Sequence, residues 1–473
     1  MARLFSMGDR DRSVVVFALF FSWLLAFPFE GQILYALAAS YRIDPSQMVF
    51  AAVAAHFVGL FSCGFFIKGL RAAKRLMLCS ILWCIAATVV FFWPPSPLWT
   101  VALVSSSFLT GGCVAAWGFF FRSGTPKRER MRTAADGLIC SNTLMIALNT
   151  AAVHLSPQVG LGLSMLVLAA AFPFARQLST SAAAASVVSS RQAKAPISIA
   201  RPLAFLCLFI LVITVNSGLM YQVLNPAYAQ HAWLTSWYWA VPYVAALFVM
   251  KGLPRKTNRA YILYVALAMI GFAFIGFMSL DRSAASYLLV NTLMLGACGV
   301  YDLFWWSILG EMLDLDRNLA RVLGIGLSAN VLGVLLGGLL GKAMASAGSP
   351  DPSSAVLALA VVCASLVLLP PLHRHLAALL KEHAFLTALA NMPPTQQGSM
   401  ADRFAQLGNL SEREREVAAL LLQGKTCRRV AGELCVSENT VKTHIKSIYS
   451  KFGIQSRAEL FDLALEKEDL GPH

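Results

Sequence analysis

The sequence predicts an all-α protein, in which a twelve-helix (6+6) integral membrane bundle is followed by a small cytoplasmic four-helix domain. Composition is the first observation, because 58% hydrophobic and 13% charged residues are far from the averages of soluble proteins. Apolar runs are the second, because segments of about 20 residues, long enough to cross a ~30 Å hydrocarbon core, recur from Ser13 to near Pro370. The third observation is that the residues from Leu410 onward carry clear start and end signals of short helices. We therefore expect 1–371 to be a polytopic membrane domain, 372–408 a cytoplasmic linker and 409–473 a separate domain.

Charged and turn-forming residues divide the membrane part into candidate spans. These are 13–37, 47–68, 75–94, 97–121, 136–155, 157–175, 202–224, 232–251, 260–279, 284–308, 322–346 and 353–371. The first run is too long for a secretory signal and lacks a small-residue cleavage site, so we interpret it as a retained span. Pro370 and Pro371 predict the end of the last span, followed by a short separate helix over 372–389 and a flexible linker.

Basic residues are distributed unevenly between alternate loops. Of the 25 Lys and Arg residues up to Lys342, 22 fall in loops that share one side, and only Arg42, Arg282 and Lys342 fall on the other. Because basic loops remain in the cytoplasm, this bias predicts a multi-pass protein of the inner membrane with both termini cytoplasmic.

An Ala- and Ser-rich stretch from Gln177 to Ala200 divides the spans into six plus six. Such a central loop resembles the major facilitator superfamily. In that family the loop between spans 2 and 3 usually carries Gly and Asp before basic residues. Here the stretch contains no Asp and consists of Gly64, Lys68, Gly69, Arg71, Lys74 and Arg75. The resemblance implies the fold and not transport.

Three ionisable side chains lie within the spans, where a charge costs ~2.5 to 3.5 kcal/mol on insertion scales. Glu30 follows a helix-disrupting Pro, His56 lies in span 2, and Asp302 lies in span 10. With polar residues such as Asn216, they predict a ligand cavity between the two halves. Alternatively, Glu30 contacts water near the outer interface, and the other two are satisfied by neighbouring helices or reach the membrane surface. The remaining polar candidates are Asn142, Asn149, Asn291 and Asn330.

Two further features of the spans have an ordinary and a functional interpretation. Glycines at three- and four-residue spacing in span 11 predict close helix packing, with a sliding gate helix as the alternative. The aromatic residues around Trp233–Trp239 and Trp305–Trp306 predict an interfacial belt, with the wall of a binding pocket as the alternative.

From Leu410 the sequence carries local signals for four short helices. Ser411 and Glu414 form an S-x-x-E capping box for the first, and Ser456 and Glu459 form one for the fourth. The remaining caps and stops are Gly424, Thr426, Ser437 and Gly453. Only two residues separate the second and third helices, as in a helix-turn-helix, whose third helix enters the DNA major groove.

Many positions of this segment match one family. They are Leu410, Ser411, Arg413, Glu414, Glu416, Val417, Gly424, Val430, Ala431, Leu434, Val436, Ser437, Thr440, Val441, Lys442, His444, Ile448, Lys451, Arg457 and Ala458. The set resembles the LuxR-type (GerE-like) DNA-binding domain and spans the whole module. The resemblance implies a transcriptional regulator that binds double-stranded DNA.

The resemblance also implies roles for individual residues. The side chains expected to contact bases are Asn439, Lys442, Thr443 and Lys446. Those expected to contact phosphates are Lys425, Thr426, Arg428, Arg429 and Lys451. The chain departs from the family at residues 427–429, where Asn, Lys and Glu are frequent, and Arg429 in place of an acid is expected to strengthen phosphate contact. Family members usually dimerise through the fourth helix, so Leu460, Phe461 and Leu463 are predicted to form a homodimer patch on DNA.

We interpret the chain as a membrane-bound transcriptional regulator, a one-component sensor that couples a small-molecule effector or a membrane condition to transcription. The signal then has to pass through residues 372–408. The alternative is a secondary transporter with a regulatory DNA-binding tail, in which Glu30 and Asp302 are coupling residues. No catalytic motif and no C-x-x-C pair is present, so we expect neither an enzyme nor a metal or other cofactor.

Overall fold

The structure is a computed structural model in which every regular element of the described residues is a helix. It describes residues 7–29, 31–180, 199–253, 259–316, 318–346, 351–391 and 410–454, and positions 457, 459, 460 and 463. The chain forms two compact units, one of Met1–Ser190 with Leu203–Pro371 and one of Arg191–Pro202 with Leu372–His473. The all-α prediction is confirmed.

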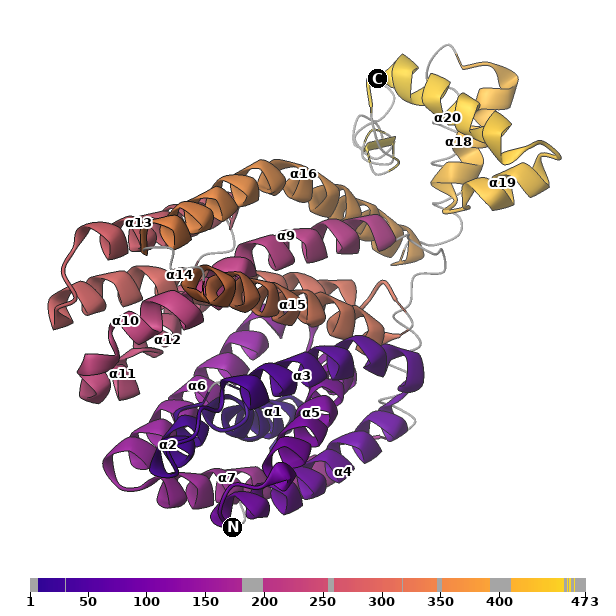
Figure 1. The fold of residues 1–473 in the computed structure, drawn as a ribbon. Coiled ribbons are helices and arrows are strands. Elements are labelled where there is room, and N and C mark those ends of the chain that lie inside the picture. Colours follow the sequence, from indigo (N-terminus) through magenta and orange to yellow (C-terminus); the bar gives the residue numbers. More distant parts are fainter. Residues whose placement is uncertain are drawn as a thin grey trace. The chain divides into compact units, whose positions relative to one another are not determined.

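The first half of the membrane unit contains seven α-helices among its described residues (Figure 1). They are α1 (Asp9–Ala26), α2 (Gln32–Ser40), α3 (Ser46–Phe66), α4 (Leu70–Val89), α5 (Pro97–Gly124), α6 (Arg130–His154) and α7 (Pro157–Gln177). Short 3₁₀ turns extend α4 over Val90–Phe92 and precede α6 over Lys127–Glu129. Pro94 and Pro95 follow the turn over Val90–Phe92 and prevent the helix from continuing, so only a short connection leads to α5.

The first predicted span is not one continuous helix. Its α1 and α2 are separated at residues 27–31, where the Phe29 amide donates to the Leu24 carbonyl at 3.0 Å instead of making the usual helical bond. Pro28 removes an amide donor, and a Cβ on Gly31 would lie 1.8 Å from the Ala26 carbonyl oxygen. The chain can therefore turn this tightly only with glycine at position 31.

The second half contains a comparable irregularity in its first span. Its helices are α9 (Ala200–Leu219), a π-helix η4 (Met220–Leu224), α10 (Asn225–Ala227), η5 (Ala229–His231), α11 (Ala232–Tyr238), α12 (Val241–Gly252), α13 (Arg259–Ser279), α14 (Ala284–Met312), α15 (Leu319–Ser346) and α16 (Asp351–Asn391). Wide π-helical turns are rare and concentrate at functional sites. The first span of each half thus departs from a regular α-helix.

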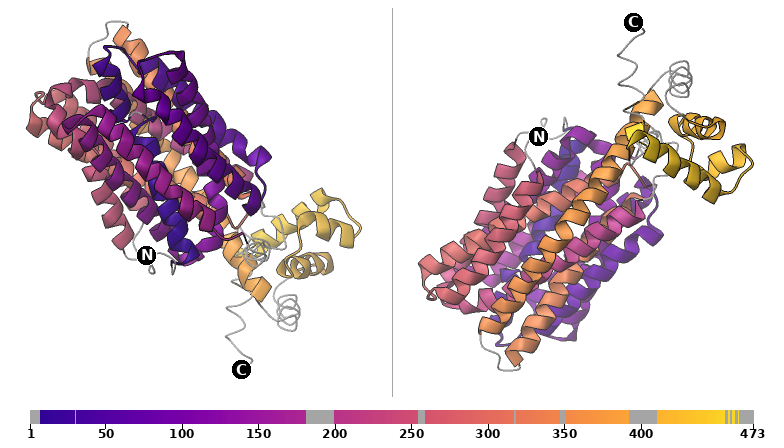
Figure 2. Two further views of the ribbon diagram at one scale, coloured as in Figure 1. Left: turned by 90° about the horizontal axis from the view of Figure 1, so that it is seen from below. Right: turned by 90° about the horizontal axis from the view of Figure 1, so that it is seen from above.

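Eleven helices of the described residues are long and apolar enough to cross a membrane, by length and composition. The helices α1 and α2 occupy the first predicted span, which is divided and is not among these eleven, so eleven of the twelve predicted spans are supported. Figure 2 shows that the long helices of this unit run in roughly one common direction.

Close contacts at glycine join α15 to both halves. It packs against α3 and α5, and a Cβ on Gly324 would lie 2.3 Å from the Leu60 carbonyl oxygen. On its other side, a Cβ on Gly337 would lie 2.1 Å from the Val215 carbonyl oxygen of α9. Small residues permit this approach between helices in lipid, which supports the close-packing interpretation of span 11.

The prediction that Pro370 and Pro371 end the last helix is wrong. Both prolines lie inside α16, which extends to Asn391. Their missing amides leave the carbonyls of Leu366 and Val367 without the usual helical donor. Such losses are tolerated where neighbouring groups or water satisfy the backbone.

The C-terminal unit contains the three predicted helices α18 (Glu412–Leu422), α19 (Cys427–Glu433) and α20 (Glu438–Phe452). Each starts at the predicted cap: Ser411 accepts from the Glu414 amide, Thr426 from Arg429 and Ser437 from Thr440. Gly424 and Gly453 adopt the left-handed conformation expected after a helix, with φ of 84° and 66°. The predicted fourth helix lies largely outside the described residues.

Candidate nucleic-acid interface and membrane cavity

One side of α20 is polar and open to solvent. Asn439, Lys442, Thr443 and Lys446 are all exposed on it, at spacings of three and four residues. Val441 and Ile448 on the opposite side are fully buried against α18 and α19. The four predicted base-contacting residues therefore share one accessible face of the helix that follows the turn, as DNA recognition requires.

Cys435 lies in the turn between α19 and α20. This residue adopts a left-handed conformation with φ of 54°, and the next amide, of Val436, donates to the Ala431 carbonyl at 3.0 Å. Glycine is the usual residue at such a helix end, because a Cβ disfavours the left-handed region. The sequence predicts a second helix through Cys435, but α19 ends two residues earlier, at Glu433, before this turn.

The predicted phosphate-contacting residues have different surroundings. Arg428 is exposed, whereas Lys425 pairs with Glu433, and Arg429 lies 3.6 Å from the same carboxylate. Thr426 caps α19 with its side chain. An acid in the middle of this basic group reduces its net charge, so Arg428 is the cation most available to a phosphate among these.

Lys451, which the sequence predicts to contact phosphate, pairs with an acid of its own domain. Its ammonium lies 2.6 Å from the Glu414 carboxylate, which also accepts from the Ser447 hydroxyl at 2.6 Å and the Ser411 amide at 2.7 Å. The Lys451 hydrogen bond, then that of Ser447 and that of the Ser411 amide, lower the pKa of Glu414 to about 2. The carboxylate thus joins the start of α18 to the end of α20.

The predicted dimer residues are not all available to a partner. Leu460 is fully buried within a single copy, Leu463 is half-buried, and Phe461 lies outside the described residues. Arg457, in the same segment, donates from Nε to the Leu421 carbonyl at 2.9 Å. Leu460 therefore serves the core of the domain.

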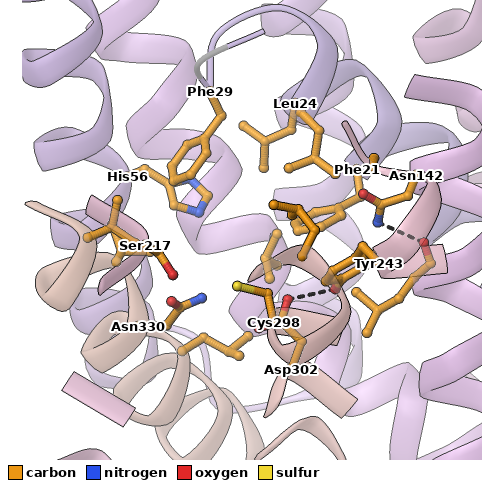
Figure 3. Close-up of a pocket in the computed structure, with 18 of the residues that line it drawn as sticks. Phe21, Leu24, Phe29, His56, Asn142, Ser217, Tyr243, Cys298, Asp302 and Asn330 are labelled. Carbon is orange, nitrogen blue, oxygen red and sulfur yellow. Dashed lines mark hydrogen bonds between the residues drawn. The ribbon is translucent and has the colours of Figure 1, made fainter. Parts of the chain in front are cut away.

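The membrane unit contains a cavity of about 160 Å³ between its two halves (Figure 3). His56 and Asp302 line it from opposite halves, together with Asn142 and Asn330. Both irregular spans contribute, through Phe29 and through the pair Met220 and Tyr221. Asn216 is buried but does not line this cavity, and Glu30 lies outside the described residues.

Polar contacts orient the side chains of the cavity. The Tyr243 hydroxyl donates to Asp302 Oδ2 at 2.6 Å, and Asn142 Nδ2 donates to the Leu138 carbonyl at 2.8 Å (Figure 3). His56 Nδ1 lies 3.0 Å from Thr110 Oγ1 and 3.2 Å from the Ser107 carbonyl. His56 is therefore both satisfied by a neighbouring helix and part of the cavity wall. Trp239 and Trp306, which the sequence favoured as interfacial residues, also line the cavity.

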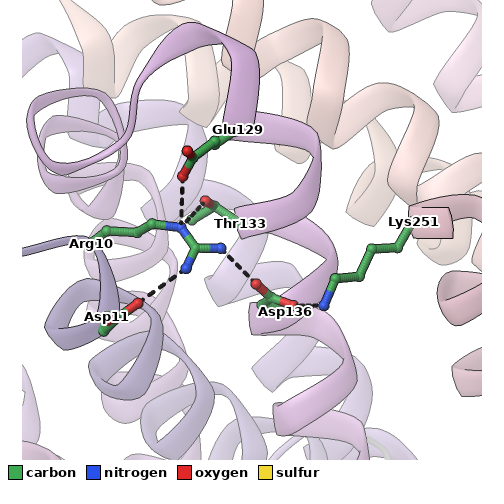
Figure 4. A network of polar contacts seen from close by, with 6 residues as sticks. All are labelled: Arg10, Asp11, Glu129, Thr133, Asp136 and Lys251. Atoms are coloured by element: carbon green, nitrogen blue, oxygen red, sulfur yellow. Dashed lines mark hydrogen bonds and ion pairs between the residues drawn. The ribbon is translucent and has the colours of Figure 1, made fainter. Parts of the chain in front are cut away.

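Two ion clusters in the described part of the membrane unit join the halves, and the sequence did not predict them. Asp136 pairs with Arg10 at 2.7 Å from the first half and with Lys251 from the second (Figure 4). Arg10 also lies near Asp11, Glu129 and Thr133. Acidic residues within strongly basic loops are the sequence signal that could have predicted these ion pairs.

The second cluster is centred on Asp314, which follows α14. Its carboxylate accepts from Arg130 at 2.8 and 2.9 Å and from Arg122 at 3.0 Å, and both arginines are buried. Burial raises the pKa of Asp314, but the hydrogen bonds and charges of the two arginines outweigh it and hold the pKa below its usual range. Rearranging the halves would separate these charges.

Comparison with known proteins identifies the C-terminal module. Residues 408–464 match the family described as bacterial regulatory proteins, luxR family. The chain is 46% identical over 50 residues to the spore germination protein GerE of Bacillus subtilis, covering 11% of this chain and 68% of that protein. It is 38% identical over 85 residues to the transcriptional activator ExaE of Pseudomonas putida, or 18% and 38% of the two chains. An HTH-type transcriptional regulator of Aeromonas salmonicida is 50% identical over 56 residues, or 12% and 29%. The chain thus spans less than half the length of the last two relatives.

The membrane unit has a solved structural neighbour. The crystal structure of the human organic anion transporter MFSD10 superposes with a TM-score of 0.58 and 14% identity, covering 77% of this chain and all of that one. At this identity the likeness shows the fold alone. The chain belongs to the luxR family of bacterial regulatory proteins, and its helical membrane unit shares the fold of this solved structure.

Proposed function

We propose that this protein is a one-component sensor of the inner membrane, in which a small molecule bound in the cavity changes DNA binding by the cytoplasmic tail. The observation that carries the proposal is that one chain combines a polar and aromatic cavity with a helix-turn-helix whose second helix, α20, has an open polar face. Binding sites of this kind are concave, mostly apolar and contain a few placed polar groups.

The DNA contacts follow from the exposed face of α20. Lys442, Thr443, Lys446 and Asn439 would meet base edges in the major groove, and Arg428 with its basic neighbours would meet phosphates. A homodimer would read two half-sites about one helical turn apart. Phe461 and Leu463 remain the proposed contact residues, since Leu460 is buried in one copy.

Coupling would act through the two halves of the membrane unit. A ligand shifts a conformational equilibrium only if it binds one arrangement more tightly than the other. The cavity is lined from both halves, and the clusters of Asp136 and Asp314 hold those halves together. A change in their relative position would reach the tail through residues 372–408 and alter its orientation or dimerisation.

Chromatin immunoprecipitation of the tagged full-length protein tests DNA binding in the cell. We expect discrete peaks that disappear in the Lys442→Ala, Lys446→Ala variant and persist in Arg415→Ala, which removes an exposed cation from α18. An empty profile for the wild-type protein under several growth conditions would refute the regulator. Deleting residues 1–371 tests sensing, because a response that survives this deletion cannot originate in the membrane unit.

Transport is the second candidate function, favoured by a carboxylate, Asp302, within a cavity of transporter-like fold. Coupling residues of transporters are ionisable groups of this kind. Counterflow of a labelled cavity ligand into proteoliposomes separates the two functions. Uptake that is lost in Asp302→Asn would establish transport, whereas binding without uptake would leave the sensor alone.

A further inference from the structure

We infer that the membrane cavity selects a small protonated amine with an apolar or aromatic body, an inference that rests on the proposed sensing function. The first argument is charge. Among the described residues that line the cavity, Asp302 is the carboxylate, and none is Lys or Arg. An anionic ligand would face this carboxylate in a region of low dielectric without a compensating cation, at a large cost.

Hydrogen-bonding capacity is the second argument. Contact of His56 Nδ1 with the Ser107 carbonyl requires a proton on Nδ1, because a carbonyl only accepts. In the neutral ring, Nε2 is then an acceptor. Asn142 uses its amide nitrogen on the Leu138 carbonyl, which leaves its Oδ1 as an acceptor.

The Asp302 side chain completes this set of acceptors. The Tyr243 hydroxyl donates its proton to Oδ2, so that this hydroxyl is no longer a free donor, and Oδ1 remains as an acceptor. Acceptors therefore come from both halves of the cavity, on His56, Asn142 and Asp302 (Figure 3). An ammonium group with two or three N–H donors can satisfy several of them at once.

Aromatic walls are the third argument. Among the described residues, the Phe, Tyr and Trp side chains that line the cavity are Phe21, Phe29, Tyr221, Trp239, Tyr243 and Trp306. Aromatic faces attract cations and also bury the apolar body of a ligand. The volume of about 160 Å³ suits a small molecule. Carboxylate, acceptors and aromatic faces together are the complement of an amine carrying one ring or a short chain.

A series of ligands with one body and three charges tests the inference on the purified full-length protein. The probes are phenethylamine, phenethyl alcohol and hydrocinnamate, which are cationic, neutral and anionic near neutral pH. Binding is measured by quenching of tryptophan fluorescence, since Trp239 and Trp306 line the cavity, and by the ligand-induced rise in melting temperature. We expect the amine to bind roughly tenfold or more tightly than the alcohol, and hydrocinnamate to bind least.

Variants assign this preference to the carboxylate. Asp302→Asn should weaken phenethylamine binding by roughly 10- to 100-fold and leave phenethyl alcohol binding unchanged. The double variant Asp302→Asn, Asn330→Asp returns a carboxylate to the same cavity and should recover part of the preference for the amine. Melting curves without ligand show that each variant is folded. The matched control Asp281→Asn removes a carboxylate outside the cavity and should keep the preference.

The inference is overturned if the alcohol or hydrocinnamate binds as tightly as the amine, or if the amine fails to bind at millimolar concentration. An amine preference that persists in Asp302→Asn also overturns it. Chromatin occupancy, measured with and without phenethylamine, distinguishes a failure of this inference from a failure of the proposed function. Selective amine binding with unchanged occupancy would support the ligand class and refute sensing of that ligand, whereas effector-dependent occupancy without amine preference would refute the ligand class alone.

Discussion

We expect the Glu414 carboxylate to stabilise the C-terminal module more than its other polar side chains do. The substitution Glu414→Gln removes the charge with little change in shape. In the folded domain it accepts from the Lys451 ammonium, the Ser447 hydroxyl and the Ser411 amide. Its side chain is only 6% exposed. Truncating a buried, charged hydrogen-bond acceptor costs more than losing a surface ion pair.

The magnitude follows from the pKa of Glu414, which falls from 4.5 to about 2 on folding. At about 1.4 kcal/mol for each tenfold change in proton affinity, the full shift is equivalent to roughly 3 kcal/mol. Solvent screening reduces this figure because Lys451 is 40% exposed, so we expect a loss of roughly 2 kcal/mol. A folded pKa below the unfolded one gives stability that is fully present above pH 4.5 and is lost as the pH falls toward about 2.

Urea unfolding of a fragment comprising residues 401–473 measures this effect by circular dichroism. The 50 matched residues make up 68% of GerE, so a natural protein little longer than the module exists. Glu414→Gln should be less stable than wild type near neutral pH, and the two should converge in acid. Glu416→Gln is the control, because its partner Arg413 is 39% exposed and the pair should contribute under about 1 kcal/mol. A loss in Glu414→Gln no larger than in the control, or a difference that does not shrink in acid, would refute the reasoning.

Three other substitutions test separate features. Gly31→Ala places a methyl group 1.8 Å from a backbone oxygen and should abolish the folded protein seen on size-exclusion chromatography. The control Gly162→Ala, whose methyl group meets nothing within 4 Å, should leave the yield of folded protein unchanged. A normal yield of Gly31→Ala would contradict the tight turn. Cys435→Gly should stabilise the 401–473 fragment against urea by about 1 kcal/mol, because glycine adopts the left-handed conformation without strain, and a loss of stability would show that the side chain matters. Asp314→Asn leaves two buried arginines without their carboxylate and should destabilise the membrane unit by about 3 to 5 kcal/mol, seen as a large drop in melting temperature. An unchanged melting temperature would mean that this cluster does not hold the halves together.

The local structure of the DNA-binding module was predictable from sequence to within a few residues. The capping box of Ser411 and Glu414, the caps at Thr426 and Ser437, and the stop at Gly453 all occur as expected. Caps act between residues three positions apart, and the apolar stripe of α20 repeats within one helix, so these signals need no knowledge of distant segments. Where the prediction erred, at the end of α19, Cys435 occupies a position at which glycine is the recognised signal.

Which distant residues meet was decided by tertiary structure. The sequence placed His56 and Asp302 within spans, but only packing shows that both line one cavity whereas Asn216 does not. Likewise, the charge pattern predicted basic loops without revealing that Asp136 and Asp314 join the halves. Span positions, caps and loop charges depend on hydropathy and short-range hydrogen bonds, which are legible along the chain. Pairing of buried polar groups depends on which helices pack face to face, and that is determined by contacts between residues more than a hundred positions apart.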